Sequence, residues 1–402
     1  MVPPGGVLVN SFGIDRAKRS RVTEPSPLER GRALAAAGNH QAALETLLDA
    51  AHDDPTNVGT HLALYEVAQL LERPDLALEH QRRAIALAPV HSTPAHRAEA
   101  YALLVPSVPG PFTANTPVDL LFDPQHVTIH RWYVDPDRAV PPLPPYDAVF
   151  VAAGESQAAQ PALKMLAEIL PHQPAPVVNR PERVARLGRI PFAELFARAR
   201  FCRVVPTARL TRVTYAERGF VLPHIVRPVD SHGGHGLERI DDDRARDAYL
   251  ARVDAPELYV QPFVDYRSSD GFYRKYRIIF VDGEPYPFHL AISPRWMVHY
   301  YNAAMTEHQW MRDEEHAFLA RMDAVFDGEL RAALDEAARL LALDYVGIDC
   351  AIDRDGKLLI FEADNALLVH LLDDRSLFPY KFTYVPRIYA AVDAMIRRRI
   401  GR

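Results

Sequence analysis

The sequence predicts three parts in order: α-helical repeats, a small α/β domain and a larger α+β domain. Three observations support this order. A repeat of helical periodicity occupies 28–89, β-rich apolar runs alternate with one helical pattern over 118–178, and many short apolar strands with two amphipathic helices follow from about 180. Strands that alternate with helices favour a parallel sheet, whereas successive strands favour an antiparallel or mixed sheet.

The composition is that of a globular protein. The chain has 402 residues, of which 48% are apolar and 24% charged, with a net charge of −6. These values exclude general disorder and a strongly basic nucleic-acid-binding surface. No apolar run reaches the roughly 18–20 residues that span a bilayer, no secretory signal is present, and two cysteines cannot form a disulfide framework. We expect a cytoplasmic protein with no nucleic-acid or membrane partner.

The repeat unit is 34 residues long. Leu44 aligns with Leu78 and Pro55 with Pro89, and each unit contains two helical patterns separated by a turn. This period resembles the tetratricopeptide repeat, which implies binding of a peptide or protein; a helical cap or a dimerisation module is the alternative, so a homodimer stays open. A third repeat helix is expected at 92–105. We assign 1–24 to a mobile tail and 25–106 to the repeats.

A Pro-rich segment at 106–117 predicts a domain boundary. We expect the α/β domain over 107–180, with strands at 118–122, 146–152 and 177–178 and a helix at 157–170. The α+β domain would occupy 181–402, with helices at 329–343 and 385–400. Its strands are expected at 204–205, 224–228, 258–263, 276–281, 287–292, 347–352 and 358–362.

Three carboxylates follow two apolar strands that are joined by a turn at Asp353–Gly356. Glu362 and Asp364 are two residues apart, so they project from the same side of an extended strand, and a hairpin can bring Asp349 opposite them. Three convergent carboxylates in an apolar stretch need a cation, and a site with oxygen ligands alone favours Mg²⁺. The alternative is that these acids only solvate the end of the hairpin.

A Ser/Gly-rich loop follows the apolar strand that ends in Arg227-Pro228. Its glycines would let backbone N–H groups approach phosphate oxygens, although a surface turn is an equal alternative. His232 and His235 are expected to make loop contacts. Farther along the chain, Arg274 and Arg277 are three apart on a strand and therefore face opposite sides, so at most one of them points into a site.

In this order the segments resemble the ATP-grasp superfamily of ligases. The matching residues are Asn179-Arg-Pro181, Arg227-Pro228 with its Gly loop, Gln261-Pro-Phe-Val264, and Asp349 with Glu362-x-Asp364. The resemblance covers roughly 118–400. It implies an ATP-grasp domain of two subdomains with a hinge near 261–265, preceded by a small α/β domain. Its cofactors would be ATP and Mg²⁺.

The resemblance also implies roles for single residues. Arg227, and Arg186 or Arg189, would replace lysines that bind phosphates. Catalytic roles fall to Arg277, Arg295 and Asn365, and the Mg²⁺ ligands would be Asp349, Glu362 and Asp364. Residues that bind the nucleotide would be Ser231, Gly233, Gly234 and Gly236 in the loop, Gln261, Phe263 and Val264 around adenine, and Asp265 at the ribose.

The activity implied is ATP-dependent joining of a carboxylate to an amine. Three departures from the family pattern qualify it. Arginines replace both lysines, Asp364 stands where Asn is usual, and Ala-Leu-Leu-Val-His370 replaces a Pro-Gly loop. Of the 46 basic residues, 41 are Arg, so Arg in place of Lys reflects the whole chain's usage. A non-catalytic nucleotide-binding scaffold is the alternative function.

Overall fold

A computed structural model describes residues 25–229, 231 and 234–402; the predicted tail at 1–24 lies outside this range. Four helices come first, and they form two antiparallel hairpins: α1 (Pro27–Ala36), α2 (His40–Asp53), α3 (Val58–Leu70) and α4 (Pro74–Leu87). The starts and ends of α2 and α4 are each 34 residues apart, as the repeat predicts. Leu44, Leu47 and Leu64 form the centre of their shared apolar core.

A five-stranded sheet follows in the order β1-β3-β2-β4-β5. Its strands are β1 (Val90–Thr93), β2 (Tyr101–Ser107), β3 (Val127–Tyr133), β4 (Ala148–Phe150) and β5 (Val177–Val178). All neighbouring strands are parallel except β1, which pairs antiparallel with β3. The helices α5 (Val118–Leu121) and α6 (Gln160–Ile169) belong to this domain. The sheet is therefore parallel, as predicted, except at its edge strand β1.

Two predictions in this region are wrong. Residues 92–105 do not form a third repeat helix, because 101–107 is the fully buried strand β2, in which a continuous apolar run suits a parallel strand covered on both faces. The Pro-rich boundary at 106 thus falls inside β2. Residues 118–122 are not a strand: Val118 and Leu121, three apart, are both buried, which is helical spacing.

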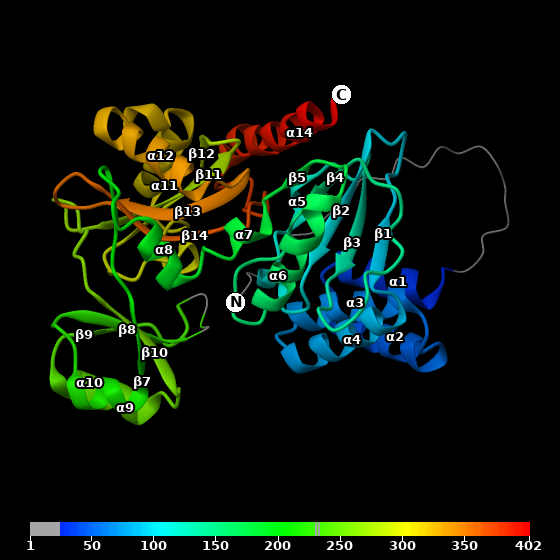
Figure 1. Ribbon diagram of the computed structural model, residues 1–402, viewed down its shortest axis with the longest axis horizontal. Helices are drawn as coiled ribbons and strands as arrows, with labels where there is room; N and C mark the ends of the chain where they lie inside the picture. The colour runs from blue at the N-terminus through cyan, green and yellow to red at the C-terminus, as the bar shows by residue number, and fades with distance from the viewer. Residues whose placement is uncertain (1–24, 230, 232–233) are drawn as a thin grey trace.

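Two short helices, α7 (Pro181–Val184) and α8 (Arg189–Leu195), lead into an antiparallel sheet of order β7-β10-β8-β9. Its strands are β7 (Ala208–Thr211), β8 (His224–Pro228), β9 (Glu238–Ile240) and β10 (Glu257–Pro262). The helices α9 (Arg212–Arg218) and α10 (Asp243–Arg252) pack on it through the cluster of Tyr215, Val226 and Tyr249. In Figure 1 this sheet and its helices form a separate lobe.

The third sheet has the order β12-β11-β13-β14-β6. Its strands are β6 (Cys202–Val204), β11 (Tyr273–Val281), β12 (Glu284–Ser293), β13 (Tyr345–Ile352) and β14 (Leu358–Asp364); only the β14–β6 pair is parallel. The helices of this part are α11 (Gln309–Ala320), α12 (Gly328–Leu341), α13 (Lys381–Tyr384) and α14 (Pro386–Ile400). The strands and helices predicted beyond residue 180 are confirmed to within a few residues.

Specific polar contacts join the parts. The helical hairpins meet the first sheet where the Tyr65 hydroxyl donates to the carbonyl of Gly110 (2.8 Å) and the N–H of Gly110 donates to Gln81 (2.8 Å). Asn179, fully buried at the end of β5, bonds with its side chain to the backbone of Asp344 and Tyr345 at the start of β13. In Figure 1, α14 runs from the third sheet toward β4 and β5.

Candidate active site

The strands β11, β13 and β14 place charged residues in one row across the third sheet. Asp349 on β13 lies opposite Arg277 on β11 and opposite Glu362 on β14, while Gly347 lies opposite Asp364. A register shift directly after Asp349 changes the pairing of β13 with β14. The sheet thus brings together Arg277, Asp349 and Glu362 from three separate segments, with Asp364 one position farther along the face.

Asp349 is fully buried and is bonded to two cations. Arg277 donates from Nε to Oδ1 (2.7 Å) and from Nη2 to Oδ2 (3.0 Å), and Lys275 donates from Nζ to Oδ2 (2.9 Å). Burial alone would raise the pKa of Asp349, but the charges of Arg277 and Lys275 outweigh it and hold the pKa well below its usual range. Both oxygens of this carboxylate are therefore engaged.

The predicted metal ligands differ in how well they fit a cation. Asp349 is already compensated by Arg277 and Lys275, so a metal ion bound to it would lie beside two positive charges. Burial, assisted by the charge of Glu362, raises the pKa of Asp364 to about 7, although a backbone hydrogen bond from Ala366 and the charge of Arg277 act in the opposite direction. No salt bridge joins Asp364 to a basic side chain within the described residues, and these contain no group of three or more acidic, His or Cys side chains arranged for a metal.

Two further arginines lie beside Glu362. The Arg189 guanidinium on α8 is 3.3 Å from a Glu362 oxygen. Arg227, at the end of β8, is nearly buried, and burial together with the charge of Arg189 lowers its pKa to about 10. A lowered guanidinium pKa means that burial has removed water from the positive charge and that nearby anions do not fully replace this hydration. This position favours an anion as the missing partner.

The Gly loop begins beside Arg227. Arg227 donates from Nε to the Ser231 hydroxyl (2.9 Å), and the same hydroxyl donates to the carbonyl of Pro228 (2.8 Å). Gly234 and Gly236 have positive φ angles of 77° and 64°, which glycine adopts without strain. A Cβ on Gly234 would lie 2.4 Å from Nε2 of His299. Gly233 and His232 lie outside the described residues.

A small enclosed space separates the second and third sheets. It measures about 30 Å³, the room of one water, and most of its walls are apolar. The residues that line it are Leu187, Arg189, Phe192, Val204, Val205, Thr207, Gln261, Ile360, Phe361 and Glu362. Of the residues predicted to surround adenine, only Gln261 lies here, where the Thr207 hydroxyl donates to its side-chain oxygen (2.9 Å).

The other residues predicted around the nucleotide base have different neighbours. Phe263 packs edge-on against Trp296 and beneath the guanidinium of Arg239, and Val264 packs against the main core. The structure thus divides the predicted adenine pocket between Gln261, in the enclosed space, and two side chains outside it.

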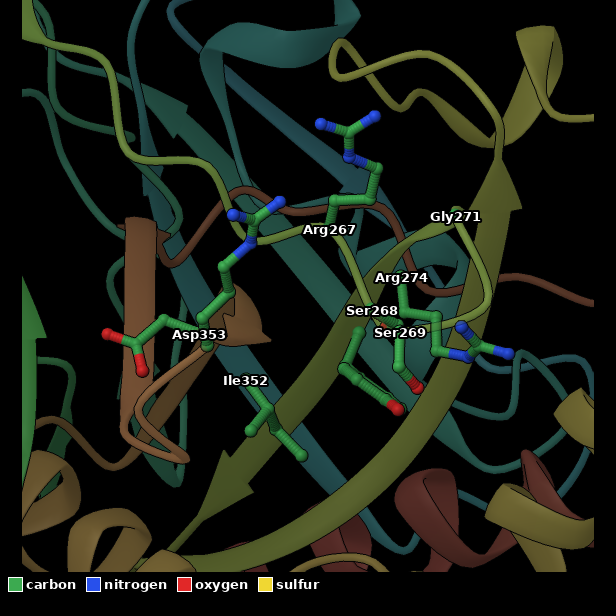
Figure 2. A pocket seen from close by; sticks show the side chains of 9 residues that line it. Arg267, Ser268, Ser269, Gly271, Arg274, Ile352 and Asp353 are labelled. Carbon is green, nitrogen blue, oxygen red and sulfur yellow. The ribbon is translucent and has the colours of Figure 1, made fainter.

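Asp265 lies beside a second, open cavity of about 690 Å³, shown in Figure 2. The cavity lies between the 267–274 segment and the end of β13, and its lining includes Arg267, Ser268, Arg274 and Arg354. Asp265 pairs with both Arg267 (3.3 Å) and Arg354 (2.7 Å), and Arg274 pairs with Asp270 and Glu314. The carboxylate predicted for the ribose is therefore occupied by two arginines, and the cavity's cations are neutralised.

Two residues predicted as catalytic, Asn365 and Arg295, lie away from the row of charged residues. Asn365 is fully buried and its amide donates to the carbonyl of Ala153 (3.0 Å), which ties the end of β14 to the first sheet. Arg295 follows β12 and its side chain is exposed. Neither joins the row formed by Arg277, Asp349 and Glu362.

Sequence reasoning missed two residues of the site. Lys275 is two residues before Arg277 and shares its face of β11; this i, i+2 spacing was the available signal. His299 touches the Gly loop, and its Nε2 is buried without a hydrogen-bond partner in the described part of the chain. Burial, followed by the charge of Lys275, lowers the pKa of His299. No local pattern marks His299, because a tertiary contact places it.

No protein-family model matches the chain, and no curated protein matches it. Among solved structures it is similar to D-alanine–D-alanine ligase from Bacillus anthracis, with 12% identity, 75% of this chain and 98% of that chain covered, and a TM-score of 0.44. The RimK domain protein ATP-grasp from Sphaerobacter thermophilus gives 17% identity, coverage of 73% and 99%, and a TM-score of 0.44. One B. anthracis ligase structure is a complex with ATP.

No described helix is long and apolar enough to cross a membrane.

Proposed function

We propose that this chain is an ATP-grasp ligase that uses ATP to join a carboxylate to an amine, with release of ADP and phosphate. The observation that carries the proposal is the gathering of basic side chains from three elements around Asp349 and Glu362. Arg189 on α8, Arg227 on β8, and Lys275 with Arg277 on β11 surround the two acids. Such a group of partly desolvated cations suits a polyphosphate and the transfer of a phosphoryl group.

The nucleotide would lie between the second and third sheets. Arg189 and Arg227 would bind its phosphates, and Gln261 would contact the base in the enclosed space. Because that space holds about 30 Å³, binding requires the β7–β10 lobe to move away from β14. The proposed hinge at 261–265 covers the end of β10 and the start of the connection to β11. Ser231, Gly234 and Gly236 would close over the phosphates and exclude water.

Glu362 and Asp364 would hold a magnesium ion, which when bound would neutralise charge on the phosphates. Their oxygen-only chemistry and the raised pKa of Asp364 support this assignment. The sequence predicts Asp349 as a ligand of the same ion, but in this structure its carboxylate is bonded to Arg277 and Lys275, and a metal ion there would have to displace or adjoin these cations.

The chain's own residues would serve each chemical stage. The substrate carboxylate would accept the terminal phosphoryl group of ATP, and the amine would then attack the acyl carbon and expel phosphate. Arg277 would face the oxygens that gain charge in both steps. Arg295 lies on an exposed segment after β12 and would reach the site only when that segment folds inward.

The helical hairpins suggest how a substrate is presented. Tetratricopeptide-like hairpins suit a peptide or a segment of a protein, and here they are fixed to the first sheet through Tyr65 and Gln81. We therefore favour a peptide or protein-borne carboxylate or amine over two free small molecules.

The test is ADP release from the full chain with ATP and Mg²⁺ in the presence of pooled amino acids and peptides. We expect at least one pool to stimulate ADP formation, and Arg227→Met to abolish the stimulation. Arg218→Met, on α9, is a matched control that should leave it unchanged. Tight ATP binding without stimulated turnover from any pool would instead indicate the nucleotide-binding scaffold.

A further inference from the structure

We propose that Lys275 and Arg277 form a cation pair that binds the terminal phosphate of ATP, and that Asp349 positions this pair instead of binding metal. The inference rests on the proposed function, since it takes ATP as the ligand. It adds Lys275 to the binding residues and gives Asp349 a different role from that of Glu362 and Asp364.

Both cations lie on the same face of β11 and are held at the same carboxylate. Positions i and i+2 of a strand project to one side, and both side chains reach Asp349 on the neighbouring strand β13. The side chains of Lys275 and Arg277 are 12% and 16% exposed, against 2% for Asp349. The Asp349 carboxylate is thus covered by the Lys275 and Arg277 side chains, which themselves remain partly exposed to the site.

The charges do not cancel. Lys275 and Arg277 share the carboxylate of Asp349, and the charges of Glu362 and Asp364 also act on Arg277. With Arg189 and Arg227, four cations face three acids, so the cluster keeps a net positive charge in a partly desolvated position, where an anion is the natural partner. The Lys275 ammonium has three N–H donors, and within the described residues it donates one hydrogen bond, to Asp349. Donors therefore remain for a phosphate, whereas the charge of Asp349 is already compensated by the two cations that bond to it, and these cations would repel a metal ion at the same carboxylate.

The pair lies close to the Gly loop. His299 contacts Gly234 in that loop, and the charges of Lys275 and Arg227 both act on the His299 ring. Lys275 is therefore near the loop that begins at Arg227. A nucleotide whose inner phosphates contact Arg227 and Arg189 would direct its terminal phosphate toward β11.

The first experiment compares two nucleotides on the full chain by titration calorimetry. Lys275→Met should weaken binding of AMPPNP, a non-hydrolysable ATP analogue, about tenfold through loss of one charge-assisted hydrogen bond, and leave ADP binding unchanged. Lys275→Arg should restore most of the loss. Lys357→Met, which removes a lysine paired with Glu329 on the surface, is the matched control. Equal AMPPNP affinity in wild type and Lys275→Met would overturn the inference.

The second experiment separates the two roles of Asp349. If Asp349 positions the cations, Asp349→Asn should leave unchanged the Mg²⁺ concentration that gives half-maximal AMPPNP binding, whereas Asp364→Asn should raise it. A tenfold or larger rise in Asp349→Asn would identify a metal ligand and overturn the inference. If Asp349→Asn fails to fold, the Lys275→Met result decides. A wild-type chain that binds neither nucleotide would refute the proposed function itself.

Discussion

Arg277 and Asp349 face each other directly across β11 and β13 and are joined by two hydrogen bonds of 2.7 and 3.0 Å. The pair has the fork-to-carboxylate geometry that makes arginine more than a point charge. A Nη1 contact of 3.5 Å with the carbonyl of Leu368 extends from the same guanidinium to the segment that follows β14. The Arg277 side chain therefore connects three parts of the third sheet.

Replacing Arg277 should destabilise the fold as well as the site. Arg277→Met leaves a buried carboxylate with Lys275 as its remaining cation, and we expect a loss of about 3 kcal/mol in the free energy of unfolding, measured in urea. Arg267→Met is the control: it removes a partner of Asp265 from a pair near the surface and should cost less than about 1 kcal/mol. Similar losses in the two variants would contradict the buried role.

Asn179 links the first sheet to the start of β13, and its backbone conformation leads to a separate prediction. It has a φ of 60°, and its side chain accepts two hydrogen bonds and donates one at the start of β13. Asn179→Gly and Asn179→Ala both lose these bonds. Only Ala is strained at this φ, so Asn179→Ala should be less stable by about 0.5–1 kcal/mol, by urea unfolding. Equal stability of the two variants would show that the lost hydrogen bonds matter and the φ angle does not.

Much of the fold could be predicted because short-range patterns in the sequence determine its helices and hairpins. The hairpin of β13 and β14 follows from two apolar strands around a turn at Asp353–Gly356, and its register places Asp349 opposite Glu362 as expected. The 34-residue period likewise gave α2 and α4. Apolar strand runs around a turn and the 34-residue repeat period are short-range patterns. They can therefore be recognised in the sequence without knowledge of tertiary contacts.

What could not be predicted depends on distant partners. Asp349 appears in the sequence as a third metal ligand, and only the pairing of β11 with β13 reveals that Lys275 and Arg277 occupy it. The 34-residue repeat predicts a helix at 92–105, and the buried apolar run of β2 at 101–107 has no period of its own that would contradict this. His299 is placed by its contact with Gly234, which no spacing encodes.

The Gly234–His299 contact should control nucleotide binding. Gly234→Ala places a Cβ 2.4 Å from the imidazole and strains a φ of 77°, so the loop must move, and we expect about tenfold weaker ATP binding by calorimetry. Gly356→Ala is the matched control, because its φ of 74° is similar but no heavy atom lies within 4 Å of the added Cβ. If both variants bind ATP like the wild type, the loop is not part of the site.

Glu336 on α12 fixes the entry to β6 by binding three successive backbone N–H groups. Its carboxylate accepts from Arg200 (2.9 Å), Phe201 (2.7 Å) and Cys202 (3.2 Å). Burial alone would raise the pKa of Glu336, but these backbone hydrogen bonds outweigh it and lower the pKa below its usual value. Because β6 pairs with β14, this carboxylate supports the strand that carries Glu362 and Asp364.

The lowered pKa gives a pH-dependent prediction with a definite sign. A carboxylate whose pKa is lower in the folded state stabilises the fold above its unfolded pKa, about 4.3, and loses that contribution as the pH falls through the folded value. Glu336→Gln should therefore cost about 1–3 kcal/mol at pH 7 and progressively less below pH of about 4. Urea unfolding at several pH values measures this, with Glu79→Gln on the surface of α4 as control. A cost that stays constant down to pH of about 3 would show that shape, and not charge, holds the junction.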